Sequence, residues 1–146
     1  MASIAPPHSL FATFIEGPPL RRTRDCATEQ RICHAVLKGR GSLMGFGAAS
    51  EITGLTQHRE VSPCGPSSDA EVYTRRIRTT SGVLALRASG EKCPTDVGFR
   101  VTARYRVDGN SSTGVFAGAR GSGIDRVDLL PGHSARVTIC GTLRIG

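Results

Sequence analysis

The segment GFRVTARYRV, residues 98–107, constrains the fold most strongly, because its apolar and polar residues alternate strictly. One face carries the residues Phe99, Val101, Ala103, Tyr105 and Val107, and the other carries Arg100, Thr102, Arg104 and Arg106. A period of two is typical of a β-strand with one face in a core and the other in water. The closing segment, 135–145, repeats the pattern. We therefore expect a sheet with an apolar inner face and a basic outer face.

Short runs between turn residues predict six further strands, over residues 10–15, 35–47, 49–61, 71–79, 82–89 and 114–130. No stretch sustains the apolar spacing of an amphipathic helix. Eight consecutive antiparallel strands favour an all-β, up-and-down, lipocalin-like barrel, because closure removes the exposed edges. A two-sheet sandwich is the alternative. Residues 1–9 are predicted to be a flexible arm, and residues 10–146 a single barrel domain.

The chain has 146 residues and a net charge of +7, and arginine supplies most of its positive charge. These arginines are scattered and aromatic residues are few, whereas nucleic-acid sites gather charge and interleave aromatics. We therefore expect no nucleic-acid partner. No segment approaches the roughly 18 apolar residues of a membrane helix, so no membrane partner is expected either. The alternative is polyanion binding by the outward arginines Arg100, Arg104, Arg106, Arg136 and Arg144.

Five cysteines are present, none of them in a CxxC pair, and the four histidines are far apart. A metal site is therefore not expected. Two disulfides are predicted: Cys26–Cys33 within one polar loop, and Cys64–Cys93 between two turns that contain proline. Cys140 is then either a free thiol or an intermolecular link. Disulfides indicate an oxidising compartment, so we expect a secreted protein whose signal peptide has been removed. If the start is native, the protein is cytoplasmic and its cysteines are reduced.

The stretch TGVFAGARGSG, residues 113–123, holds four glycines. A phosphate-binding loop would need a lysine where Ile124 stands, and a helix after it. The following residues alternate like a strand instead, so no helix N-terminus is available for a phosphate. Glycines within a strand are typical of barrel bends, bulges and close backbone contacts. We predict a bent barrel strand here, with Phe116 packing inward.

The segment GVFAGARGSG also resembles the G-x-F-x-G-A-x-G-S-G segment of the allene oxide cyclase and dirigent-like β-barrel superfamily. The chain looks closest to small secreted actinobacterial members, which carry a cysteine-flanked loop before a GFGAA strand, as between Cys26 and Ala49. The resemblance implies an eight-stranded lipocalin-like barrel that forms dimers or trimers in the plant branches. Its activities include ring closures and radical couplings steered by the barrel cavity. No residue here matches a catalytic motif of the plant enzymes.

Polar residues predicted to face inward are candidates for chemistry. The strand over 49–61 is ambiguous, because Glu51, Thr53 and Arg59 share one face while Ile52 and His58 share the other. If the first face is inward, a Glu–Arg pair with tyrosines could orient a carbonyl or carboxylate ligand and transfer a proton. The candidate catalytic residues are Glu51, Arg75 and Tyr105, and the candidate ligand-binding residues are Arg59, Tyr73, Phe99 and Phe116. The alternative is an ion pair that fills the barrel, with tyrosines as core.

These residues favour a barrel that binds a small apolar molecule. The alternative function is a cyclase or isomerase that steers ring closure of a flexible apolar substrate. No cofactor is expected for either function, and no spacing indicates a Ser–His–Asp arrangement.

Overall fold

The computed structural model describes residues 8–22, 32–59, 64, 69–130, 132 and 134–146. Its elements are β1 (His8–Glu16), β2 (Arg21–Arg22), β3 (Ile32–Leu43), β4 (Gly47–Arg59), β5 (Asp69–Thr79), β6 (Gly82–Pro94), β7 (Phe99–Val107), η2 (Gly109–Ser111), η3 (Gly114–Phe116), β8 (Ser122–Leu129) and β9 (Ala135–Leu143). Within these residues no helix is long and apolar enough to cross a membrane.

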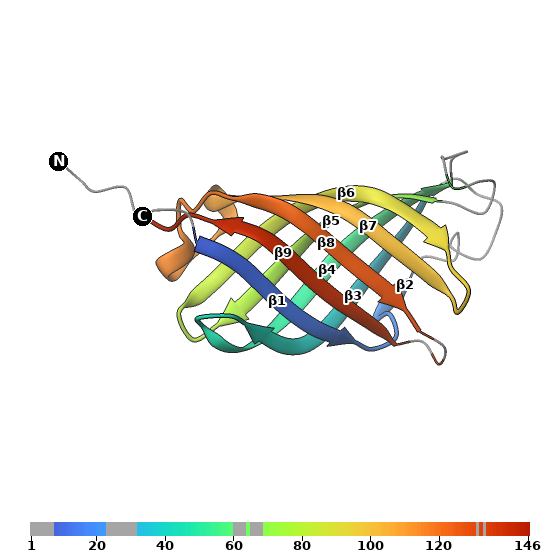
Figure 1. The fold of residues 1–146 in the computed structure, drawn as a ribbon, viewed down its shortest axis with the longest axis horizontal. Coiled ribbons are helices and arrows are strands. Elements are labelled where there is room, and N and C mark those ends of the chain that lie inside the picture. The colour runs from blue at the N-terminus through green and yellow to red at the C-terminus, as the bar shows by residue number, and fades with distance from the viewer. Residues whose placement is uncertain (1–7, 23–31, 60–63, 65–68, 131, 133) are drawn as a thin grey trace.

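The strands form one closed antiparallel barrel (Figure 1). Each long strand pairs with the next in the chain, and β1 closes the ring by pairing with both β9 and β3. The two-residue β2 continues the edge of β1 along β3, so the ring has eight strands. This confirms the predicted eight-stranded up-and-down barrel and excludes the sandwich.

Alternating burial confirms the predicted strand faces. In β7, Val101, Ala103 and Tyr105 are buried, and Thr102 and Arg104 between them are exposed. The ambiguous strand is resolved as well: Glu51 and Thr53 of β4 are buried, whereas Ile52 is exposed. The inward face is therefore the one that carries the glutamate.

The glycine-rich segment corrects the prediction of a bent strand. Residues 114–116 form the 3-10 helix η3, and β8 begins only at Ser122. The Val115 amide donates to the Ser81 carbonyl at 3.0 Å, and the Thr113 amide donates to the Val83 carbonyl at 2.8 Å. Gly114 has a φ of +61°, and a Cβ on it would overlap the Ser81 carbonyl oxygen. The glycines therefore allow a second backbone to approach closely. The spacing of the glycines in the sequence fits a close backbone contact and a strand bend equally well.

The two ends of the barrel differ (Figure 1). We call the end with η3, the turn at residues 44–46 and the β5–β6 hairpin the packed end. There Phe116 is fully buried, as predicted, with its ring centroid 4.8 Å from that of Phe46. We call the other end, with the β6–β7 hairpin and the segment between β8 and β9, the cavity end.

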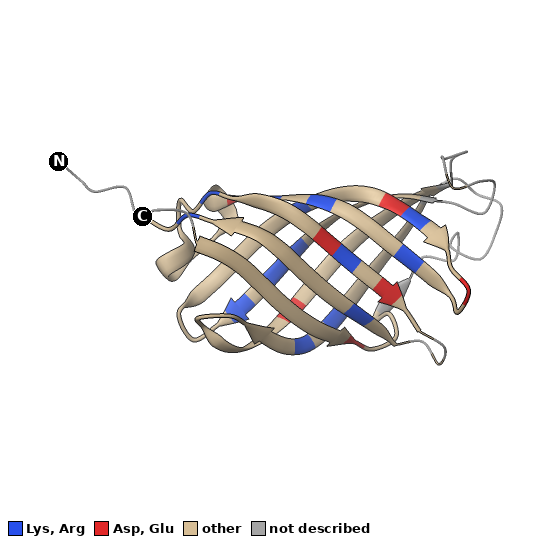
Figure 2. Ribbon diagram, in the orientation of Figure 1, with Lys and Arg blue, Asp and Glu red and all other residues tan. Residues whose placement is uncertain are grey.

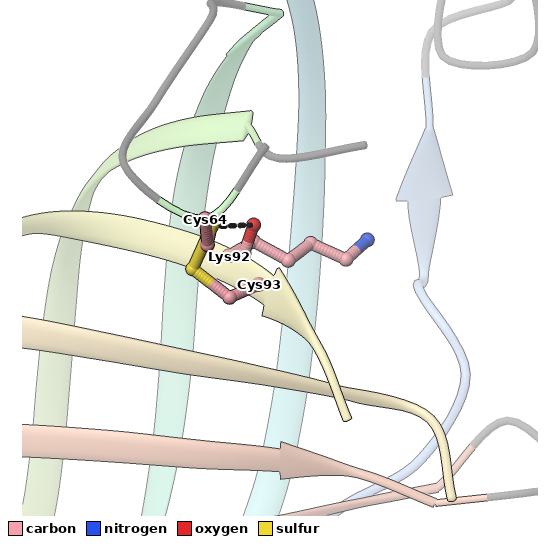
Figure 3. Close-up of a disulfide and its surroundings, with 3 residues drawn as sticks. All are labelled: Cys64, Lys92 and Cys93. Atoms are coloured by element: carbon pink, nitrogen blue, oxygen red, sulfur yellow. Dashed lines mark hydrogen bonds between the residues drawn. A yellow bond between two sulfur atoms is a disulfide. The ribbon is translucent and has the colours of Figure 1, made fainter. Parts of the chain in front are cut away.

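A disulfide joins Cys64 to Cys93 of β6 at the cavity end, as predicted (Figure 3). The Cys64 sulfur also lies 3.9 Å from the Lys92 carbonyl oxygen. Cys140 is an exposed free cysteine. The Cys26–Cys33 pairing stays a prediction, because Cys26 lies outside the described residues.

Candidate ligand cavity

A cavity of about 410 Å³ occupies the cavity end of the barrel interior. Its wall is mainly apolar and includes Leu37, Leu55, Val101, Val127 and Leu129. Cavities between 300 and 1,000 Å³ with apolar walls and few polar groups are typical of small-molecule sites. The polar side chains that line it are Glu16, Thr53, Gln57, Glu71, Tyr73, Arg75, Lys92 and Ser134.

Arg75 of β5 forms the base of this cavity and is almost fully buried. Its guanidinium binds Asp125 through two parallel hydrogen bonds, from Nε at 2.8 Å and from Nη2 at 3.1 Å. Its Nη1 donates to Glu16 at 3.0 Å, to Glu51 at 3.1 Å and to the Thr53 hydroxyl at 2.9 Å. The same hydroxyl donates to Glu51 at 2.6 Å. The guanidinium is thus engaged by protein groups on all three nitrogens.

The Arg75 cluster, defined as Arg75 with Glu16, Glu51 and Asp125, joins strands that are not neighbours in the ring. Glu16 lies on β1 and Asp125 on β8, each separated from β5 by two intervening strands in the ring order. Removing one partner of such a buried ion pair leaves an uncompensated charge, which costs about 3–5 kcal/mol. The cluster therefore holds opposite walls of the barrel at a fixed separation.

The surroundings of Glu16 shift the pKa of its carboxyl. Burial, reinforced by the neighbouring Glu51 carboxyl, raises the pKa of Glu16 from 4.5 to about 8 against the opposing effect of Arg75. Glu16 therefore holds its proton near neutral pH. For Arg75, burial disfavours the charged form, but Asp125, Glu16 and Glu51 outweigh it and hold its pKa above the ordinary value.

Tyr73 lies beside the cluster, on the same face of β5. Its ring centroid is 5.1 Å from the Arg75 guanidinium carbon, a cation–π contact. The residue is 4% exposed and lines the cavity, yet its hydroxyl has no hydrogen-bond partner among the described residues. Burial, together with the Asp125 charge, raises the pKa of Tyr73 above its usual range, so the hydroxyl stays protonated. An unpartnered buried hydroxyl that lines a cavity is suited to bind a ligand group.

The structure brings only some of the predicted site residues together. Glu51, Arg75 and Tyr73 lie together at the base of the cavity, because the face of β4 that carries Glu51 points inward. Tyr105 is buried toward the packed end, where its hydroxyl donates to the Thr142 carbonyl at 3.2 Å. Burial raises the pKa of Tyr105 to about 12. Neither Tyr105 nor Phe116 lines the cavity.

Two more of the predicted ligand-binding residues are Phe99 and Arg59. Phe99 lies near the rim of the cavity. Phe99 is 38% exposed and lies under the Lys92 ammonium, whose nitrogen is 4.8 Å from the ring centroid. Phe99 is not part of the cavity wall formed by the described residues, whereas Lys92 is. The side chain of Arg59 lies outside what the structure describes, so its role stays a prediction.

Sequence analysis missed Glu16 and Asp125, although a signal existed for each. Asp125 shares the inward face of β8 with Val127, and the alternation around it was recognised. Glu16 continues the buried series Leu10, Ala12 and Phe14. The predicted first strand ended at Ile15, one residue too early, so Glu16 was left out of it. An acidic residue in phase with an apolar face was the available signal.

Lysine and arginine positions are spread over several strands of the barrel and do not gather in one place (Figure 2). Arg104 and Arg106 are exposed on β7 and Arg136 is exposed on β9, with β8 between these strands. Asp128 of β8 accepts a hydrogen bond from Arg100 at 2.7 Å, which offsets part of the positive charge on this face.

In comparisons with known proteins, no family model, no curated protein and no solved structure matches this chain. What is established is therefore the closed eight-stranded barrel, which is compatible with ligand binding.

Proposed function

We propose that this protein binds a small, mainly apolar molecule inside the cavity end of its barrel. The observation that carries the proposal is the cavity of about 410 Å³, walled by aliphatic side chains and closed at its base by the Arg75 cluster. Ligand sites are usually concave and apolar, with a few polar groups that fix orientation. Here Arg75, Glu16 and Tyr73 lie at the base, and aliphatic side chains make up much of the wall.

The proposal includes membership of the allene oxide cyclase and dirigent-like superfamily, which the glycine-rich segment suggests and the closed barrel fits. A secreted location belongs to it as well, supported by the disulfide between Cys64 and Cys93. The dimer or trimer implied by the resemblance stays a prediction.

Titration with the neutral fluorophore N-phenyl-1-naphthylamine tests the binding function, since its emission rises in apolar surroundings. Ala35 lines the cavity, so Ala35→Trp fills part of it. The neighbouring His34 is exposed, and His34→Trp is the matched control. We expect Ala35→Trp to weaken dye binding at least tenfold and His34→Trp to leave it unchanged. If the dye binds Ala35→Trp like the parent protein, the cavity is not its site.

A cofactor-independent cyclase or isomerase is the second candidate, favoured by one observation. Glu16 lines the cavity, and burial beside Glu51 raises the pKa of its carboxyl to about 8. General acids and bases work best when their pKa lies near the working pH. Glu16 is therefore suited to give a proton to, or take one from, a substrate held against the wall.

Proton abstraction from 5-nitrobenzisoxazole separates the two candidates. A carboxylate takes the proton from the ring carbon, the nitrogen–oxygen bond breaks, and the electron pair leaves on oxygen as a coloured cyanophenolate. With an active Glu16, the rate should rise with pH around about 8 and vanish in Glu16→Gln, while dye binding persists. If the parent protein and Glu16→Gln react at the same rate at every pH, the binding function is favoured over the enzyme.

A further inference from the structure

The charges around the cavity indicate the chemical class of its ligand, an inference that rests on the proposed binding function. Arg75 is not available to an anionic ligand, because its three nitrogens already donate to Asp125, Glu16, Glu51 and Thr53. The guanidinium is therefore poorly placed to bind a ligand carboxylate, which was one of the two ligand groups expected for the Glu–Arg pair. Lys92, the other cation of the wall, has its ammonium over the Phe99 ring at the rim.

Carboxyl groups outnumber cations around this cavity in the described part of the chain. The titratable groups that face it or form its base are Glu16 of β1, Glu51 of β4, Glu71, Tyr73 and Arg75 of β5, Lys92 of β6 and Asp125 of β8. Among the described residues β3 and β9 contribute none, and Tyr105 of β7 is bound to the Thr142 carbonyl. At the base, three carboxyls surround the single guanidinium of Arg75, so a further anion there would be repelled in a surrounding of low dielectric.

Two polar atoms at the base are left without a protein partner. The Tyr73 hydroxyl has none, and neither has the second carboxyl oxygen, Oε1, of Glu51. Both residues are more than nine-tenths buried, and the Tyr73 hydroxyl belongs to a residue of the cavity wall. A buried hydroxyl without a partner costs free energy that a ligand donor or acceptor would recover.

We infer that the cavity takes an apolar molecule bearing a primary amine, with the ammonium at the base donating to the Glu16 carboxylate and the Tyr73 hydroxyl. Both residues contact Arg75. An oxygen of Glu16 lies 3.0 Å from the Nη1 of Arg75, and the ring centroid of Tyr73 lies 5.1 Å from the guanidinium carbon. An ammonium has three donors and no acceptor, which matches a base that is rich in acceptors. Its charge offsets the surplus of carboxylates, while the alkyl part contacts the aliphatic wall.

Displacement of bound N-phenyl-1-naphthylamine by octylamine, octanol and octanoate tests this inference, since the three probes differ only in their head group. At pH 9 octylamine should displace the dye at a concentration at least tenfold lower than the other two. If octanol or octanoate does as well as octylamine, the inference is wrong and the binding function stands. If the dye itself ignores the cavity-filling Ala35→Trp substitution, the proposed function fails first.

The pH dependence of displacement gives a second readout. An ammonium beside Glu16 favours the ionised carboxylate, so octylamine should bind roughly tenfold more tightly at pH 9 than at pH 7, as proton release from a group with a pKa of about 8 requires. Octanol should show no such rise. An octylamine affinity that stays flat over this range in the parent protein would overturn the inference.

Two variants assign the effect to the named groups. Glu16→Gln should remove both the preference for octylamine and its pH dependence. Tyr73→Phe removes an unpartnered hydroxyl and so should leave the melting temperature unchanged, while octylamine affinity falls about tenfold, the size of one hydrogen bond to a charged group. Circular dichroism verifies that each variant is folded. Equal octylamine affinity in both folded variants and the parent would refute the assignment.

Discussion

The two ends of this barrel have the same strands but different interiors. At the packed end the inward positions carry Phe14, Leu84, Phe116 and Leu143, and all of them are buried with almost no exposure. At the cavity end the inward residues include both aliphatic ones, such as Leu37 and Leu55, and polar ones, such as Glu16 and Gln57, and a space of about 410 Å³ stays open. An eight-stranded barrel has room for either a core or one small ligand. This barrel uses one end for each.

The boundary between the ends is the Arg75 cluster, which faces the cavity on one side and lies against the core on the other. A polar boundary of this kind closes the base of the cavity without aliphatic packing. The following predictions test whether stability depends on the packed end and the cluster, and whether the cavity end is free to bind.

The largest expected effect is that of Arg75→Met, which leaves three buried carboxyls without their cation. We expect the free energy of unfolding to fall by about 3–5 kcal/mol. The adjacent Arg76 is exposed on the same strand, and Arg76→Met is the matched control, with a change within about 0.5 kcal/mol. Urea denaturation of both variants measures the difference. Equal stability of the two would mean that the cluster does not hold the barrel together.

A matched pair of leucines compares the two ends directly. Leu84 is fully buried in the core, so Leu84→Ala should cost about 3–4 kcal/mol, because it removes methyl groups and leaves a new cavity. Leu55 already borders the open space, so Leu55→Ala adds little new void and should cost about 1–2 kcal/mol. Urea denaturation again gives both values. If Leu55→Ala costs as much as Leu84→Ala, the cavity end is packed as tightly as the other.

The disulfide should stabilise the cavity end by closing a loop between residues 29 positions apart. Replacing both Cys64 and Cys93 by serine should lower the free energy of unfolding by about 2–4 kcal/mol. Cys140→Ser is the control, since Cys140 is exposed and unpaired and should change stability little. Thermal unfolding followed by circular dichroism measures both. A loss in the control as large as in the double variant would contradict the assignment.

The stability of the protein should also change with pH. The pKa of Glu16 is raised in the folded protein to about 8, so between pH 4.5 and 8 the folded state keeps a proton that the unfolded chain has released. Stability should therefore fall as pH rises across this interval, by at most about 1.4 kcal/mol per pH unit for one group, and level off above it.

Glu16→Gln should flatten this slope, because its side chain does not titrate. Asp96→Asn, at an exposed carboxyl in the β6–β7 hairpin, should leave the slope unchanged. Urea denaturation at a series of pH values provides the test, and an unchanged slope in Glu16→Gln would assign the proton to another group.

Much of the wall of this barrel was predictable from local pattern. Strict alternation around Val101 and Val137 placed their faces correctly, because a strand turns successive side chains to opposite sides whatever its neighbours are. The Cys64–Cys93 pairing followed from their turn context. The glycine-rich segment was harder, because a strand bend and a close backbone contact both select glycine, and only the approach of residues 81–83 distinguishes them.

The sequence by itself determined the all-β class and the inward face of the strictly alternating strands, since both follow from a period of two. The closure of the sheet and the inward face of the strand over 49–61 needed the structure. Only the tertiary structure decided the site. Arg75 meets Glu16 from 59 residues away and Asp125 from 50 residues away because ring closure and register bring β1 and β8 toward β5. The tertiary structure also decided that an open space remains at one end of the barrel. The size of this space depends on the summed side-chain volumes of all eight strands, which no single strand pattern gives.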